Sequence, residues 1–184
     1  MSEAIHECPL CWIEAHSGNP SVKCHKFDPK KYRFKIKKPL PPIQVCDVPH
    51  LEGMPAQVII ATDRRTKKVV EARIEIPPIE MYASKEERTR VILHEIGHVI
   101  AKGLSARERR EYADISQEDD FEEKYFVRWF PVVAMGGTFI GFEREERRMK
   151  EIIDWMRANI VQSDLPVTLG FYGNGMKVTR KIEY

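Results

Sequence analysis

The sequence lacks any long apolar run. Its longest weakly polar stretch is VVAMGGTFIGF, residues 132–142, whereas a membrane-spanning helix needs about 20 consecutive apolar residues. The amino-terminal MSEAIHECPL shows no basic leader followed by an apolar core. We therefore expect a cytoplasmic protein that has no membrane partner.

The sequence also has little net charge, because 30 basic and 28 acidic residues leave only +2 at pH 7. Overall charge thus favours no class of partner. Hydrophobic residues make up 42% and charged residues 32%, which is typical of a soluble globular protein and excludes disorder as the main theme. A chain of 184 residues suits one catalytic domain with a small accessory module.

Cysteine is scarce, and all four cysteines lie in the first quarter of the chain. In a reducing compartment such clustering favours metal binding over disulfides. The motif CPLC offers Cys8 and Cys11 as a tight pair of zinc ligands, and Cys24 follows at a spacing familiar from zinc fingers and ribbons. A redox dithiol is the alternative interpretation of CPLC, but the strand-to-helix context of thioredoxin-like motifs is missing.

Cys46 is our choice for the fourth ligand, because thiolates are softer than imidazoles and Cys46 would otherwise be unpaired. His6, His16, His25 and His50 stay open as alternatives. We therefore predict a zinc-ribbon-like module with one structural zinc over residues 1–50 and a second domain over residues 51–184.

Positive charge gathers in KCHKFDPKKYRFKIKK, residues 23–38, where one aspartate opposes eight basic residues. Phe27, Tyr32 and Phe34 are interleaved and suit stacking on bases while the cations contact phosphates. Equally weighted alternatives are a solvated basic strand, or a surface that docks the acidic run SQEDDFEEK or a protein partner. The candidate nucleic-acid contacts are Lys30, Lys31, Arg33, Lys35, Lys37 and Lys38.

The remaining pattern predicts an α+β fold with a small twisted antiparallel sheet packed on helices. Residues 56–76 read as a hairpin, and residues 167–184 as a terminal hairpin around Asn174. A helix begins after Ser84, where Glu87 completes a capping-box pattern, and ends near Gly103. Further helices are centred on residues 118–130 and 144–161, and the last carries a core-facing apolar stripe. This stripe consists of Met149, Ile152, Ile153, Met156 and Ile160.

HEIGH, residues 94–98, lies in the first of these helices. His94 and His98 are four residues apart, so they lie on one helix face and can hold one metal ion. Glu95 is placed beside them to take a proton from an activated water, which is why this spacing recurs in zinc hydrolases. The alternative is an ordinary surface pair of histidines. Apolar flanks and Gly97 in a helix interior favour the metal site.

The order of hairpin, capped helix with HEIGH and acidic helix ending in FVRWFP resembles the minimal gluzincin metallopeptidases, most of all the ImmA/IrrE-type family, over residues 55–135. The resemblance implies a zinc metalloendopeptidase acting on protein or peptide substrates, with zinc on two histidines and a glutamate of the next helix. The family helix reads Glu-Ala-Asn-x-Phe-Ala before a proline. Here Glu122 and Phe126 have that separation, Glu123 and Lys124 replace the small and amide residues, and Pro131 comes two residues early.

The resemblance further suggests that EARIEIPP, residues 71–78, forms the rim where a peptide adds as a strand. Helical spacing also favours Glu122 as the third ligand, because Glu118, Glu122 and Phe126 share one side whereas Glu123 falls on a polar face. Tyr112 and Tyr172 are weak candidates for stabilising the oxyanion. The alternative function is a zinc-containing nucleic-acid-binding or regulatory protein on an inactive peptidase scaffold; Glu95 favours the enzyme, because a structural histidine pair needs no such carboxylate.

Overall fold

The computed structural model describes residues 23–48, 56–173 and 176–184, with backbone alone for residues 173 and 176–183. Its first layer is a four-stranded sheet in the order β1-β3-β5-β4. These strands are β1 (Cys24–Lys26), β3 (Ile43–Asp47), β4 (Gln57–Thr62) and β5 (Val69–Ile76). β4 and β5 form the expected antiparallel hairpin, but β3 runs parallel to β5. The sheet is therefore mixed, which corrects the prediction of an antiparallel sheet.

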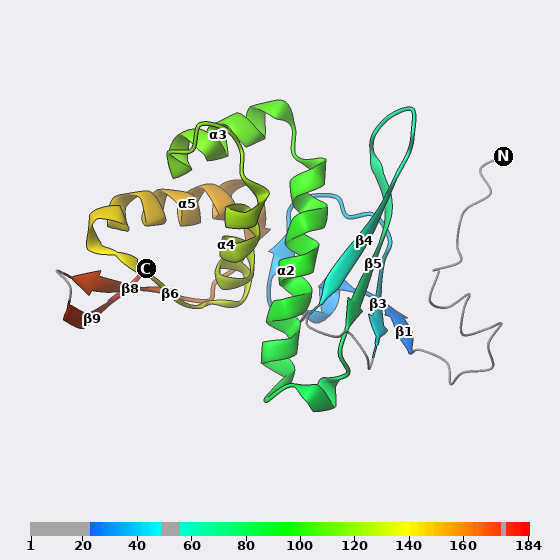
Figure 1. Cartoon of the computed structure of the whole chain (residues 1–184), viewed down its shortest axis with the longest axis horizontal. Coiled ribbons are helices and arrows are strands. Elements are labelled where there is room, and N and C mark those ends of the chain that lie inside the picture. Colours follow the sequence, from blue (N-terminus) through cyan, green and yellow to red (C-terminus); the bar gives the residue numbers. More distant parts are fainter. Residues whose placement is uncertain (1–22, 49–55, 174–175) are drawn as a thin grey trace.

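Helix α2 (Lys85–Gly103) packs against this sheet and separates it from the other helices (Figure 1). The Ser84 side chain accepts a hydrogen bond from the Glu87 N–H as expected, but the Glu87 carboxylate accepts from the Ala83 N–H rather than from Ser84, and the helix ends at Gly103 with Leu104 as its C-cap. Beyond α2 lie α3 (Ala106–Ser116), α4 (Glu123–Met135) and α5 (Glu146–Asn159). The expected stripe of α5 is buried in the core, as are Ile92, Leu93 and Ile96 of α2.

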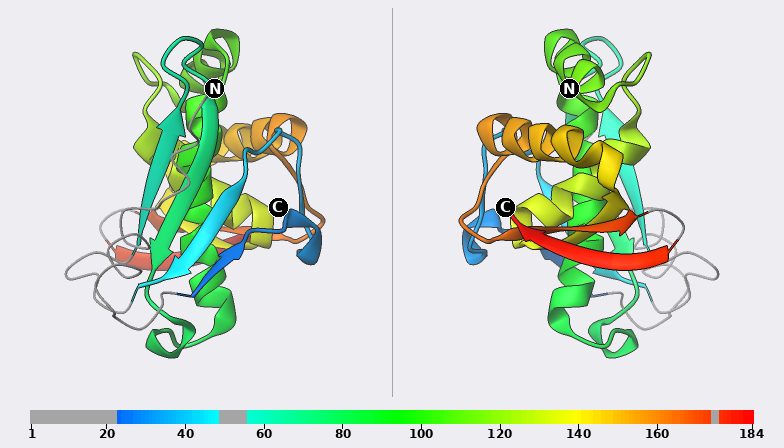
Figure 2. Two further views of the ribbon diagram at one scale, coloured as in Figure 1. Left: turned by 90° about the vertical axis from the view of Figure 1, so that its right-hand side faces the viewer. Right: turned by 90° about the vertical axis from the view of Figure 1, so that its left-hand side faces the viewer.

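A second, three-stranded sheet lies on the far side of α2 from the first (Figure 2). It has the order β6-β8-β9 and consists of β6 (Gly137–Phe142), β8 (Val167–Gly173) and β9 (Met176–Glu183). β8 and β9 form the predicted terminal hairpin, whereas β6 pairs parallel to β8. Short strands β2 (Lys35–Ile36) and β7 (Val161–Gln162) pair with each other. The remaining elements are the 3₁₀ turns η1 (Pro29–Lys31), η2 (Ile79–Met81) and η3 (Glu143–Glu145).

The boundary predicted at residue 50 does not divide the described chain. β3 pairs with β5 along five residues, and β2 pairs with β7 near the carboxyl end. Phe27, Phe34 and Val45 are buried in the same core as the helices. Residues 23–48 are thus part of the main fold, because their apolar side chains have no separate core of their own. The rest of the proposed zinc module, residues 1–22 and 49–50, lies outside the described residues.

Candidate active site

α2 presents His94 and His98 one helical turn apart. Their ring centroids are 5.2 Å apart and the rings meet edge to face at 76°. Both side chains are half-buried, while the intervening Ile96 and Gly97 are fully covered. Packing of the apolar face therefore fixes the rotation of the helix and points both imidazoles to the same side.

His94 is oriented by a carbonyl group on the neighbouring helix. It donates a hydrogen bond to the backbone carbonyl of Val127 in α4. Four residues further on is Pro131, which lies inside α4 and has no N–H to offer that carbonyl. The Val127 carbonyl therefore stays available to the His94 imidazole, and the absence of an N–H at Pro131 is the reason.

Gly97 allows this contact between the helices. A Cβ atom at Gly97 would come within 3.2 Å of the Val127 Cγ1 and 3.3 Å of its Cα. Because the glycine has no side chain, α4 can approach α2 closely at the residue whose carbonyl meets His94. Burial, followed by the nearby His98, lowers the pKa of His94, so the imidazole is held in the neutral form that binds metals.

Glu95 is almost fully covered, with 6% of its surface exposed. Burial raises the pKa of its carboxyl group, and the smaller effect of His98 lowers it. A carboxylate with a raised pKa is a stronger base than one in water. Glu95 therefore has the environment of a general base, and it lines a cleft that also contains His98.

This cleft has a volume of about 390 Å³ and lies between α2 and β4. β4 contributes one wall, α2 the floor and α4 the far side. Its lining residues include Gln57, Val58, Glu95, His98, Lys102 and Glu123. Lys102 is a residue that the sequence analysis missed, although its spacing of four from His98 places it on the same helix face as the histidines.

The rim of the cleft differs from the expected one. β5, which contains most of EARIEIPP, is flanked by β3 and β4 and has both edges paired. β4 is the outer strand, and no other described strand pairs with its free edge. The prediction for β5 is corrected: in a sheet of this order only β4 can accept a peptide beside the cleft.

Glu123, rather than Glu122, reaches the histidines. The Glu123 Oε1 lies 2.5 Å from the His98 Nδ1, and its Oε2 lies 3.5 Å from the Lys102 Nζ. Glu122 points elsewhere: its side chain is 47% exposed and pairs with the Lys124 Nζ at 2.9 Å. The reason is that α4 begins at Glu123, so Glu118 and Glu122 precede the helix and helical spacing does not relate them to Phe126.

A zinc ion fits this site by donor type, since two neutral imidazoles and one carboxylate are its usual ligands in hydrolases. As the side chains stand, Glu123 contacts Nδ1 of His98, and no three His, Cys, Asp or Glu side chains in the described ranges gather around one point. Tyr112 and Tyr172 are absent from the lining of the cleft. The suggested oxyanion roles therefore have no support in the geometry.

The cysteines of the predicted zinc module are only partly described. Cys24 and Cys46 face each other across β1 and β3 and are joined in a disulfide. The expectation that Cys24 and Cys46 bind zinc is therefore corrected for the oxidised form of the chain, because disulfide sulfurs carry no thiolate. Cys8 and Cys11 lie outside the described residues, as do His6, His16 and His50, whereas His25 is exposed on β1.

The basic segment is exposed, but its aromatic residues are occupied. Tyr32 stacks on both Phe27 and Phe34, with ring centroids 5.4 and 5.2 Å away, and the two phenylalanines are buried. The prediction that bases stack on these three rings is therefore corrected, because the rings stack on one another. Lys38 forms an ion pair with Glu108, and Lys37 donates to the Ala158 carbonyl. Exposed cations remain at Lys30, Lys31, Arg33 and Lys35.

Comparisons with family models, curated proteins and solved structures found no match to this chain. Within the part of the chain that the structure describes, no helix is both long and apolar enough to cross a membrane.

Proposed function

We propose that the chain is a zinc-dependent metalloendopeptidase in which His94, His98 and Glu123 hold the metal and Glu95 is the general base. The observation that carries the proposal is one cleft in which Glu95, His98 and Glu123 meet below the free edge of β4. A histidine pair with only a structural role has no use for a buried carboxylate between its members.

The residues divide the chemistry among them. When bound, zinc would supply a Lewis acid that lowers the pKa of water toward neutrality. Glu95 takes a proton from the attacking water and returns it to the leaving amine. Its burial supports this role, because a raised pKa brings the carboxyl closer to neutrality, where acceptance and return of a proton are both possible.

The substrate is an extended peptide that adds to β4. Main-chain hydrogen bonds to the free edge would place the peptide along the cleft, and alternate side chains would point toward α2. Lys102 lines the same cleft and carries a positive charge that can bind an acidic substrate side chain or a carbonyl oxygen. Main-chain recognition favours an endopeptidase acting on unfolded segments over an enzyme for compact substrates.

The test compares the native chain with Glu95→Gln on a denatured protein mixture, together with the zinc content of each. We expect the native chain to bind zinc and cleave, and the variant to keep its zinc and lose activity by about a hundredfold or more. His94→Ala should lose zinc and activity together. Equal cleavage by native chain and Glu95→Gln, or a native chain that binds no zinc at pH 7, would overturn the proposal.

A second candidate function is nucleic-acid binding, supported by the exposed cations of the basic segment. Reversal of Lys30, Lys31, Arg33 and Lys35 to Glu should abolish any salt-sensitive retention of DNA or RNA, because phosphate contacts release counterions. The matched control reverses four equally exposed cations in the β4–β5 turn, Arg64, Arg65, Lys67 and Lys68. Equal loss in both variants would show a nonspecific effect of charge, and no retention at low salt would remove this function.

A further inference from the structure

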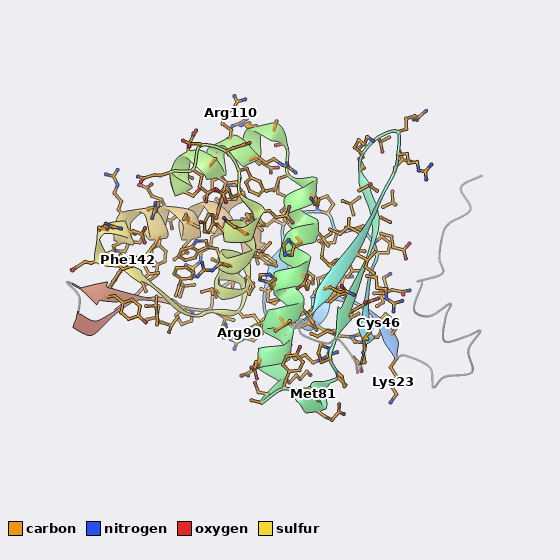
Figure 3. All side chains as sticks on the ribbon, viewed as in Figure 1. Lys23, Cys46, Met81, Arg90, Arg110 and Phe142 are labelled. Atoms are coloured by element: carbon orange, nitrogen blue, oxygen red, sulfur yellow. A yellow bond between two sulfur atoms is a disulfide. The ribbon has the colours of Figure 1, made fainter. Side chains whose placement is uncertain are left out.

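A second cavity, of about 560 Å³, lies between α3, α4, α5 and β6. It shares no lining residue with the cleft at Glu95. Its wall is rich in aromatic side chains, which include Tyr125, Trp129, Phe139 and Phe142. Phe142 is 54% exposed and lies at the outer end of the molecule, beside α5 (Figure 3). The cavity is thus wide enough for a small organic molecule and open at an aromatic rim.

Tyr112 is one of the lining residues of this cavity, and its hydroxyl group is buried. The residue is 0% exposed, and its hydroxyl has no hydrogen-bond partner in the described parts of the chain. Phe121, Phe126 and Trp155 surround the ring edge to face, with centroids 5.5 to 5.7 Å away. Native proteins rarely bury an unpaired hydroxyl, because its lost hydrogen bonds to water are not replaced. A ligand in the cavity would supply the missing partner.

The charges around the cavity favour a cation. Four carboxylates line it, against the guanidinium groups of Arg128 and Arg148. Arg148 is already paired with Glu145, and Lys124 with Glu122, which leaves two carboxylates and one guanidinium. Burial raises the pKa of Glu118, the carboxyl whose charge acts on Tyr112. A positive ligand would offset that unfavourable burial. The four carboxylates are Glu118, Asp119, Glu122 and Glu145.

The aromatic rings at the rim already attract cations of the protein itself. The Lys124 Nζ lies 4.9 Å from the ring centroid of Tyr125, and the guanidinium carbon of Arg144 lies 5.4 Å from that of Phe142. Arg128 is similarly placed over Phe139 at 5.7 Å. Ring faces carry negative potential and bind ammonium groups in this way. Three ring faces at this rim are thus already taken by cations of the protein, so the charge preference of the cavity comes from its carboxylates.

We propose that this cavity binds a small organic ammonium ion with an apolar body. Its N–H groups donate to the Tyr112 hydroxyl and the Glu118 carboxylate, and its apolar body packs on Trp129 and Phe139. The site is independent of the peptidase proposal, because no residue of the cleft takes part in it.

The test is to titrate the zinc-free and the zinc-loaded chain with 2-phenylethylamine and to measure binding by tryptophan fluorescence and calorimetry. Its carboxylate counterpart, 3-phenylpropionate, has a similar body and opposite charge. We expect the amine to bind at least about tenfold more tightly than the acid. Glu118→Gln should weaken amine binding by about tenfold, and Tyr112→Phe by several-fold. Tyr172→Phe, which removes an exposed hydroxyl outside the cavity, should leave binding unchanged.

Near-ultraviolet circular dichroism establishes that each variant keeps its packing. Glu118 is only half-buried, so Glu118→Gln remains informative where Tyr112→Phe perturbs the aromatic cluster. Equal affinity for the amine and the acid would overturn the proposal. So would unchanged binding in a folded Glu118→Gln, or no saturable signal with the amine up to about 10 mM, since that limit excludes even weak specific sites.

Discussion

At the scale of single residues, Glu122 and Glu123 are neighbours in the chain but face different cavities. We predict that Glu123→Ala lowers zinc affinity by at least about tenfold and abolishes cleavage, because the carboxylate at His98 is lost. Glu122→Ala is the matched control, one position away with the same charge removed. It should change neither zinc content nor activity, as measured by metal analysis and peptide hydrolysis. The reverse pattern would restore Glu122 as the ligand.

The carboxyl-terminal Tyr184 provides a prediction for alkaline pH. Its hydroxyl donates to Asp154 and lies 3.2 Å from the Lys150 carbonyl. Burial and the contact with Asp154 raise the pKa of Tyr184 to about 12, from 10.0. The unfolded chain therefore loses this proton first, so the stabilisation is complete below pH 10 and is lost as pH rises toward 12. Tyr184→Phe should reduce the fall in Tm across that window relative to the native chain; an identical fall in both would contradict it.

Residue types in the site could be predicted because the chemistry is local to one helix. His94, Glu95 and His98 need only the helical period to lie close together on α2, and of the three Glu95 and His98 line the cleft. The choice between Glu122 and Glu123 was different. It depended on where α4 begins, and that point is set by tertiary contacts such as Glu123 with His98 rather than by the local sequence.

At the scale of elements, α4 combines an interior proline with a role in orienting His94. We predict that Pro131→Ala lowers zinc affinity by about tenfold, because the new N–H competes with His94 for the Val127 carbonyl. The free energy of unfolding of the zinc-free chain should not fall, since proline inside a helix is unfavourable. Zinc titration and denaturant unfolding separate the two effects.

The control for this experiment is Pro29→Ala, which changes a proline at the start of η1, far from the histidines in sequence. It should leave zinc affinity unchanged. If Pro131→Ala lowers stability and zinc affinity in parallel, the proline has a packing role only, and the orientation of His94 does not depend on the missing N–H.

Element boundaries show where the sequence was informative. The start of α2 was predicted because Ser84 and Glu87 cap it locally. α3 carries an equally clear capping box in Ser105 and Glu108, and that signal was overlooked. β6 has no such local signal, because this glycine-rich strand is specified by its parallel pairing with β8. β6 ends at residue 142 and β8 begins at residue 167, 25 residues later. Parallel pairing of distant strands leaves little trace in either segment.

At the scale of the whole molecule, the first sheet joins residues on both sides of position 50. β3 lies between β1 and β5, so it supplies hydrogen bonds and buried side chains in the middle of the sheet. We predict that a chain starting at residue 51 gives no cooperative thermal transition, because removal of β3 exposes Ile74 and Ile76. Differential scanning calorimetry against the full chain measures this. A cooperative transition in the shortened chain would support the domain boundary originally predicted.

The sequence suggested a domain boundary at residue 50 for a physical reason. The many Cys, Pro and Lys residues among the first 50 indicate a small module stabilised by a metal. The few apolar residues of this segment that join the common core are hard to recognise in such a composition. Phe27, Phe34, Ile43 and Val45 are buried in the common core. Only Ile43 and Val45 share an element, the five-residue strand β3, whereas Phe27 and Phe34 lie just outside the short strands β1 and β2, so no long periodic pattern marks the four residues.

The adjacency of Glu122 and Glu123 has a thermodynamic consequence. The first turn of α4 forms part of the wall of two cavities, so a ligand that shifts this turn in one cavity changes the binding free energy in the other. Such coupling is reciprocal: the factor by which an amine alters zinc affinity must equal the factor by which zinc alters amine affinity. If both proposals hold, the concentration of a small amine would shift the fraction of the chain that carries zinc through the single peptide bond between these two carboxylates.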